Sequence, residues 1–281
     1  MHFPKYWALH REDAGMSWQW SDTSLAEAQA RAQAAAHKAA VKFASGEPLQ
    51  RYGYSDRPLR EEVLREIRDG AGALTAVITR NSYGCQVLNT TRAMFVDVDL
   101  PEPKPAAAVG GWLKSLFGKP AAPPPTPEDP ARAVLAKADA WAQQNAGWGW
   151  RVYRTKAGFR LLATHALFDP ASPAVEAVFE AMGTDPLYRR LCKVQECFRA
   201  RLTPKPWRCD METPPSRWPW QSPKQESKHR EWEARYQKAT TGFATCALVA
   251  TLGSRLVHPE LQSIVTLHDE ATRVGTVLPL A

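Results

Sequence analysis

The segment MFVDVDLP, residues 94–101, constrains the fold more than any other part of the chain. It places Asp97 and Asp99 inside an apolar run, and short runs of this kind are typical of buried strands. Because side chains alternate along a strand, both carboxylates are expected on one face, close together. A divalent cation with oxygen ligands relieves the repulsion of such a pair, so the segment predicts a Mg²⁺ or Mn²⁺ site. The alternative is a strand end with two solvated acids.

Length and composition set broad limits on the protein. The chain has 281 residues, of which 44% are hydrophobic, enough for one large domain or two small ones with a substantial core. No run of about 18 apolar residues is present, so no membrane span is expected. The beginning of the chain also lacks the apolar core of a signal peptide.

The cysteines indicate the compartment. Five cysteines without regular spacing suggest reduced thiols and a cytoplasmic protein. Cys192, Cys197 and Cys209 cluster in the sequence, but their spacing is not that of a zinc site, so we do not expect zinc.

Positive charge is concentrated in one segment. The chain carries a net charge of +7, and residues 185–208 alone hold seven basic residues against two acidic ones. Such a local excess resembles a phosphate-binding surface more than a solvated face. The segment therefore indicates an anionic partner such as nucleic acid.

The periodicity predicts a mixture of strands and helices. Strands or hairpins are expected at residues 5–20, 73–79, 85–90, 94–101, 150–153, 159–164 and 198–202. Helices are expected at residues 24–45, 59–69, 131–145, 173–182, 186–195, 228–238, 243–252 and 259–273. Asp22 or Ser24 is expected to cap the first helix. Without βα regularity, this order favours an α+β fold over a doubly wound sheet.

A compositional break interrupts the chain after the acidic segment. Residues 101–130 are rich in proline, alanine and glycine, which predicts a flexible insertion. We expect it to decorate a core that spans residues 1–208. Residues 209–281 are expected to form an irregular proline- and tryptophan-rich segment followed by a helical region.

Two further segments carry candidate phosphate ligands. The hairpin at residues 151–165 contains a glycine turn flanked by cations, a pattern that lets backbone amides and side chains approach phosphate. Its candidate residues are Arg154, Thr155, Lys156, Gly158 and Arg160. The alternative is an ordinary solvated turn.

The second segment follows Asp185. Arg199 and Arg201 alternate onto one face of an expected strand, where two guanidinium groups can clamp a triphosphate, and Lys205 lies just beyond its end. The alternative is a basic strand edge that discourages aggregation.

The order of these motifs resembles the catalytic core of the archaeo-eukaryotic primase superfamily, the primase-polymerases. That family has a hydrophobic strand ending in Asp-x-Asp, as at residues 95–99 here, and then a small-residue turn, as at residues 155–160. A further aspartate, here Asp185, precedes arginines and a proline- and lysine-containing segment, here residues 198–205. The resemblance covers residues 73–208.

The resemblance implies a fold and an activity. The fold is a modified RNA-recognition-motif-like sheet packed with an α/β subdomain, followed here by C-terminal helices. The activity is nucleotidyl transfer that starts or extends a nucleic-acid strand, with two Mg²⁺ or Mn²⁺ ions held by Asp97, Asp99 and Asp185. Nucleoside triphosphates and nucleic acid are the implied partners, and Asp210 is the alternative third acid. Replacing Asp97 or Asp99 by alanine is expected to abolish activity without unfolding the chain.

One departure from the family supports other hypotheses. Arg160 stands where the family has a histidine, and arginine binds phosphate but does not titrate. This favours a catalytically inert module that binds nucleic acid or nucleotide. A metal-dependent nuclease is a third hypothesis, since paired carboxylates with cations also serve phosphodiester hydrolysis.

Overall fold

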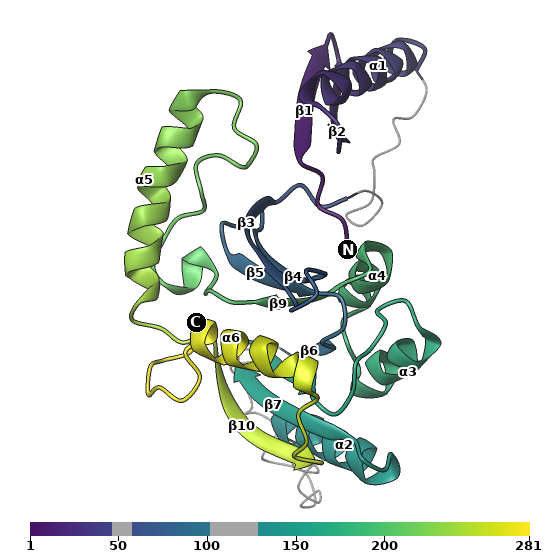
Figure 1. The fold of residues 1–281 in the computed structure, drawn as a ribbon. Coiled ribbons are helices and arrows are strands. Elements are labelled where there is room, and N and C mark those ends of the chain that lie inside the picture. The colour runs from purple at the N-terminus through teal and green to yellow at the C-terminus, as the bar shows by residue number, and fades with distance from the viewer. Residues whose placement is uncertain (47–57, 102–128) are drawn as a thin grey trace, which may run out of the picture.

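The structure is a computed structural model that describes residues 1–46, 58–101 and 129–281. Within these ranges the chain forms six α-helices and three antiparallel sheets, without a barrel (Figure 1). The α+β class expected from the sequence is confirmed. Residues 102–128, most of the expected insertion, lie outside the described ranges, and its last residue, Pro130, already belongs to a helix.

The N-terminal residues form a small unit of their own. Strands β1 (Tyr6–Glu12) and β2 (Gly15–Ser21) make the expected hairpin, and helix α1 (Leu25–Ala44) packs on it. Ser24 caps the helix by accepting a hydrogen bond from the Glu27 amide. The helix turns its fully buried alanines toward the hairpin: Ala28, Ala32 and Ala36. Figure 1 shows this unit standing apart from the remaining sheets.

Two four-stranded sheets form the body of the molecule. The sheet that we call the β9 sheet has the order β3 (Glu62–Arg68), β4 (Leu74–Arg80), β5 (Gln86–Thr90) and β9 (Phe198–Arg201). The sheet that we call the β6 sheet has the order β10 (Cys246–Gly253), β7 (Gly149–Thr155), β8 (Gly158–Ala163) and β6 (Phe95–Asp99). Strand β6 also lies against β9, so the two sheets meet there.

Helices cover both faces of the β6 sheet. Helix α2 (Pro130–Gln144) packs against β7 and β10 on one face. Helix α6 (Gln262–Thr272) lies on the other face (Figure 1). It packs there through His268, whose ring contacts Phe95 and Tyr153. The remaining helices are α3 (Pro173–Met182), α4 (Pro186–Gln195), α5 (Pro223–Thr240) and two 3₁₀ turns, η1 (Pro206–Arg208) and η2 (Pro259–Leu261).

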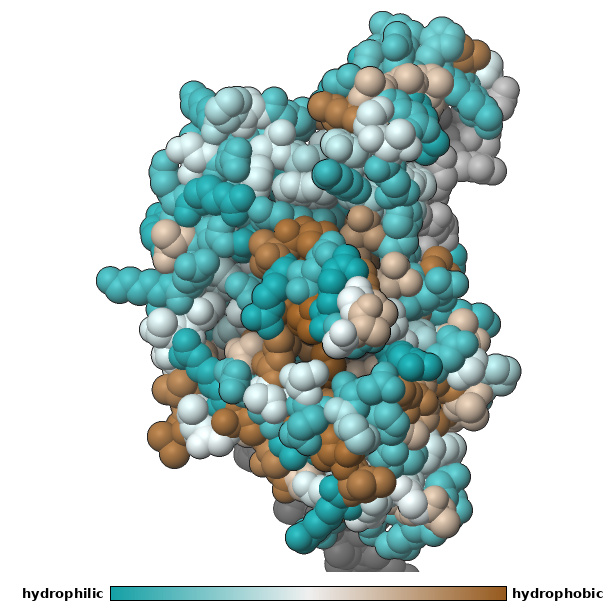
Figure 2. Space-filling model, in the orientation of Figure 1, coloured by the Kyte–Doolittle hydropathy of each residue, from teal (hydrophilic) through white to brown (hydrophobic). Residues whose placement is uncertain are grey.

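The main hydrophobic core joins the two sheets and these helices. The apolar residues of the acidic segment belong to it, since Phe95 and Val96 are completely buried and Val98 is nearly so. The expectation of a buried strand at this point is therefore confirmed. Figure 2 shows apolar residues gathered over the middle and lower parts of one face, whereas α5 and the N-terminal unit are mainly hydrophilic.

Two expected helices are strands in the structure. Residues 59–69 contain the edge strand β3, whose register with β4 shifts at two places, and both Leu64 and Ile67 pack against the core in spite of their helix-like spacing. Residues 243–252 contain most of β10, which pairs with β7. The partner strand of β10 lies about ninety residues earlier in the chain, so no local sequence pattern predicts this pairing.

The C-terminal region completes the sheet that carries the acids. Strand β10 and helix α6 both come from residues 209–281, and both pack on strands of the 1–208 region. Helix α5 begins at Pro223, earlier than expected, with Ser222 as its cap. No helix within the described residues is long and apolar enough to cross a membrane.

Candidate active site

Asp97 and Asp99 lie on one face at the end of strand β6. Their register partners on the neighbouring strand β8 are Arg160 and Gly158, respectively. Val98, which lies between the two acids, is buried on the opposite face of the strand. The Asp97 side chain is 39% exposed and Asp99 is exposed at the strand end. The expectation that both carboxylates share a face is thus confirmed.

Arg160 is the closest partner of Asp97. Its side chain is 1% exposed, and its Nε donates a hydrogen bond to Asp97 Oδ1 over 3.1 Å. Its Nη1 donates to the Arg201 carbonyl over 2.8 Å and lies 3.3 Å from His268 Nε2. A buried guanidinium needs such acceptors, so the expected phosphate ligand instead binds the first acid of the motif.

His268 belongs to a buried polar network that sequence reasoning missed. Since Arg160 Nη1 donates to Nε2, the His268 proton sits on Nδ1, which donates to Asp269 Oδ1 over 3.0 Å. Asp269 also accepts from Tyr153 and pairs with Arg151. His268 is fully buried, and only the packing of α6 on the β6 sheet brings it there.

The network predicts a loss of stability in mild acid. Burial, opposed in part by Asp269 and reinforced by Arg160, lowers the pKa of His268 to about 4 from 6.5. The unfolded chain therefore takes up this proton at a higher pH than the folded chain, so stability is full above pH 6.5 and falls as the pH decreases toward 4. About 2 kcal/mol should be lost by pH 5. Urea titrations at several pH values should show a flatter pH dependence for His268→Gln than for the wild type or for a variant of the exposed His2; an identical slope would contradict the assignment.

The hairpin between β7 and β8 is held mainly by its own residues. Thr155 Oγ1 accepts a hydrogen bond from the Gly158 amide over 3.0 Å, and Arg154 donates to the Gly158 carbonyl. A Cβ added at Gly158 would lie 2.0 Å from the Val98 carbonyl oxygen, so glycine is required for the close approach of β6 and β8. Lys156 is exposed at the turn. These contacts give three of the four residues a structural role and leave Lys156 as the solvent-facing cation.

Arg199 is part of a buried ion pair. Its Nη2 lies 2.8 and 3.0 Å from the two carboxylate oxygens of Glu61, and both side chains are at most 7% exposed. Thr79 donates to the same carboxylate and receives a hydrogen bond from Asn89. The expectation of Arg199 as a triphosphate clamp is not supported, because its guanidinium already holds a buried carboxylate.

Three cations beyond this pair lie close together, and we call Arg201, Lys205 and Arg208 the cation cluster. Burial, together with the charges of Arg160 and Arg208, lowers the pKa of Arg201, and burial with Arg201 and Arg208 lowers that of Lys205. Arg201 Nη1 is buried and has no hydrogen-bond partner among the described residues. Crowded like charges with an unsatisfied donor favour an anionic ligand. Arg208 belongs to the basic segment at residues 185–208, but the sequence did not predict it as a phosphate ligand.

The acids and the cation cluster lie within electrostatic reach of one another. Burial, and then repulsion by Asp97 and Asp185, raises the pKa of Asp99, while Lys205 and Arg201 act in the opposite direction. Asp185, the predicted third acid, is thus close enough to Asp99 to contribute to this shift. Asp185 caps α4, where its Oδ1 accepts from the Leu187 and Tyr188 amides.

A ready-made metal cage is not present in the part of the chain that the structure describes. No three His, Cys, Asp or Glu side chains converge there closely enough to hold an ion, and the five cysteines are buried free thiols. Mg²⁺ is commonly bound by one or two carboxylates together with substrate phosphates. Asp97 and Asp99 fit that mode, and metal binding stays a prediction.

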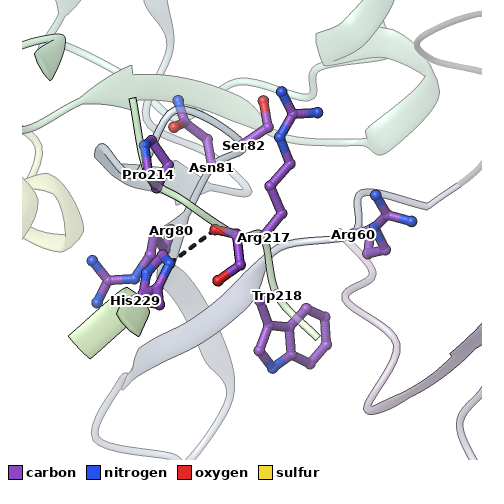
Figure 3. A pocket seen from close by; sticks show the side chains of 9 residues that line it. Arg60, Arg80, Asn81, Ser82, Pro214, Arg217, Trp218 and His229 are labelled. Carbon is purple, nitrogen blue, oxygen red and sulfur yellow. Dashed lines mark hydrogen bonds between the residues drawn. The ribbon is translucent and has the colours of Figure 1, made fainter. Parts of the chain in front are cut away.

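The best-defined cavity lies away from these residues (Figure 3). Its volume of about 30 Å³ is small, and it lies between the β4–β5 turn, residues 214–218 and α5. His229 is 1% exposed there; its Nδ1 lies 2.9 Å from the Ser216 carbonyl, and its buried Nε2 has no partner among the described residues. None of the candidate site residues lines this cavity.

Comparisons with known proteins add no relative. No family model matches the chain, and neither the curated proteins nor the solved structures contain a significant match.

Proposed function

We propose that the chain is a nucleotidyltransferase of the primase-polymerase type. One observation carries the proposal: the acidic end of β6 and the cation cluster at and beyond the end of β9 lie within electrostatic range of each other, and β6 and β9 are in contact. This is the charge arrangement that a metal–triphosphate complex requires. On this proposal the β6 sheet corresponds to the RNA-recognition-motif-like sheet and the β9 sheet to the α/β subdomain.

The acids would hold Mg²⁺ or Mn²⁺. Asp97 and Asp99 are the ligands, and Asp185 contributes negative potential from the start of α4. When bound, the ions lower the pKa of an attacking hydroxyl and brace the triphosphate and the leaving pyrophosphate. Arg160 fixes Asp97 by binding Oδ1, so the carboxylate is held in one orientation.

The cation cluster would bind the phosphates. Arg201 offers its unsatisfied Nη1, and Lys205 and Arg208 add charge close by. A bound triphosphate would relieve their mutual repulsion and would neutralise charge that develops in the transition state.

The pairing of Asp97 with Arg160 favours a second candidate, an inert module that binds nucleotide or nucleic acid. An internal cation already neutralises the first acid, and this lowers the demand of the site for a metal. The nuclease hypothesis uses the same residues and is separated from the others by its product.

Asp99→Asn tests the metal site. Wild-type protein should melt at a higher temperature in Mn²⁺ with a nucleoside triphosphate than in EDTA, since a ligand that binds only the folded state stabilises it. Asp99→Asn should lose this shift. In EDTA it should melt at or above the wild-type temperature, because burial and the neighbouring Asp97 and Asp185 raise the pKa of Asp99 and so make its charge unfavourable. Asp13→Asn is the matched control, since Asp13 is exposed on the β1–β2 turn with a φ of 46° that suits asparagine.

The same samples, supplied with labelled triphosphates and a single-stranded template, separate the hypotheses. Incorporation of labelled nucleotide by the wild type, abolished in Asp99→Asn, supports the transferase. A thermal shift without incorporation favours the inert module, and shortened strands favour the nuclease. A wild-type protein that is indifferent to Mn²⁺ and triphosphate contradicts the proposed site.

A further inference from the structure

Two exposed aromatic side chains lie beside the cation cluster. Tyr83 is 44% exposed on the turn between β4 and β5, and Trp207 is 49% exposed on η1. Their ring centroids are 5.3 Å apart, with the ring planes at 83°. Elements from distant parts of the chain thus bring two large rings together at the surface, where each leaves much of its area in water.

Both rings lie on turns whose backbone is held by hydrogen bonds. Asn81 Oδ1 accepts hydrogen bonds from the Tyr83 and Cys85 amides over 3.0 and 3.1 Å. The Arg208 amide donates to the Lys205 carbonyl across Trp207 over 2.9 Å. Little conformational freedom of the backbone is left to lose when a ligand binds, which favours a preformed docking surface.

Lys205 connects the rings with the candidate active site. Its Nζ lies 5.4 Å from the centroid of the Trp207 ring. It is also within electrostatic range of Asp99, Arg201 and Arg208. A ligand on the rings that continues past Lys205 therefore reaches the acids, and the local excess of cations requires that it carry negative charge.

We propose that Trp207, held in edge-to-face contact with Tyr83, stacks an unpaired base of single-stranded nucleic acid, with Lys205 and Arg208 binding its backbone phosphates. The combination of an aromatic surface and neighbouring cations is how proteins hold single strands without reading sequence. A duplex buries the faces of its bases in its own stack, so a single strand is the better occupant. The inference rests on the proposed function only in that the strand leads to Asp97 and Asp99.

The test measures binding in EDTA, where no chemistry occurs. Anisotropy of a labelled oligothymidylate is compared with that of an abasic strand of the same length, which keeps the phosphates and lacks the bases. Trp207→Ala should weaken binding of oligothymidylate about tenfold, and Trp207→Phe should weaken it less. Phe43→Ala is the control, since Phe43 is 59% exposed on α1. Binding of the abasic strand should be equal for wild type and Trp207→Ala.

Salt dependence separates stacking from charge. Trp207→Ala should keep the wild-type dependence on salt, whereas Arg208→Gln should reduce the slope by about one unit and weaken both strands alike. Arg255→Gln is the matched control, because Arg255 is exposed beyond the end of β10 that pairs with Gly149, away from the Thr155 turn. Melting curves of each variant exclude a folding defect.

The outcomes distinguish this inference from the proposed function. Trp207→Ala that binds oligothymidylate like the wild type overturns the stacking role, even if Mn²⁺-dependent incorporation is observed. An equal loss on the abasic strand overturns it as well, and so does a wild-type protein that binds neither strand at low salt. If Trp207→Ala loses affinity for oligothymidylate but not for the abasic strand, the stacking role is supported. If the wild type then shows no incorporation, the transferase proposal fails and the binding surface is retained.

Discussion

Replacing Arg199 by methionine is expected to lower the free energy of unfolding by about 3–5 kcal/mol. The change leaves Glu61, which is 5% exposed, without the guanidinium that binds both of its oxygens. Only the hydroxyl of Thr79 would remain as a hydrogen-bond donor to that carboxylate among the contacts described above. Urea denaturation at neutral pH measures the loss.

A double variant identifies the cause. Glu61→Gln combined with Arg199→Met removes the buried charge altogether, and should recover a large part of the loss, because replacing both partners of a buried pair is often close to neutral. If the single and the double variants are equally unstable, the loss comes from packing rather than from an unpaired carboxylate. Arg201→Gln, by contrast, should leave stability nearly unchanged, since its Nη1 has no partner to lose among the described residues.

Replacing Asp97 by alanine is expected to lower the free energy of unfolding by about 3 kcal/mol, the lower end of the range for a broken buried pair. The Asp97 carboxylate is 39% exposed, but the guanidinium that it leaves behind is 1% exposed. The expectation from sequence that the chain stays folded without either acid remains a prediction, but removal of Asp97 takes away a partner of a buried guanidinium. Burial, with repulsion by Asp97 and Asp185, raises the pKa of Asp99, whereas the Asp97 carboxylate accepts a hydrogen bond from Arg160.

Asp99→Ala provides the contrast within the same strand. Asp99 is an exposed residue, but partial burial of its carboxyl group, together with Asp97 and Asp185, raises its pKa. Its removal should therefore leave the melting temperature unchanged or slightly higher. Equal destabilisation by Asp97→Ala and Asp99→Ala in EDTA would contradict the assigned pairing. The comparison also matters for any activity assay, because lost activity in Asp97→Ala is interpretable only after its folding has been checked.

These contrasts indicate different roles for the two acids in binding a metal ion. Asp97 is oriented by a buried cation, whereas Asp99 lies at the exposed strand end with a carboxyl group crowded by other acids. A metal ion would gain most from Asp99, whose charge is unfavourable without one. A substitution of Asp99 is therefore the sharper test of the metal site.

Features that depend on neighbouring residues were predictable from the sequence. The alternation of β6 placed Asp97 and Asp99 on one face, and the alanines after Ser24 indicated α1 with its cap. The turn at Gly158 was also recognised, because such signals are set by local backbone geometry.

Tertiary structure alone decided what each charge does. Arg199 and Arg201 are two residues apart, yet one is neutralised by Glu61, 138 residues away, and the other keeps an unsatisfied donor beside Asp97. His268 reaches Arg160 from a helix 108 residues further along the chain. The role of a charge depends on its burial and on its nearest counter-charge, and both are set by the register of distant strands and the packing of α6. No local pattern in the sequence encodes those contacts, which is why the acidic strand could be found by reading along the chain and its partners could not.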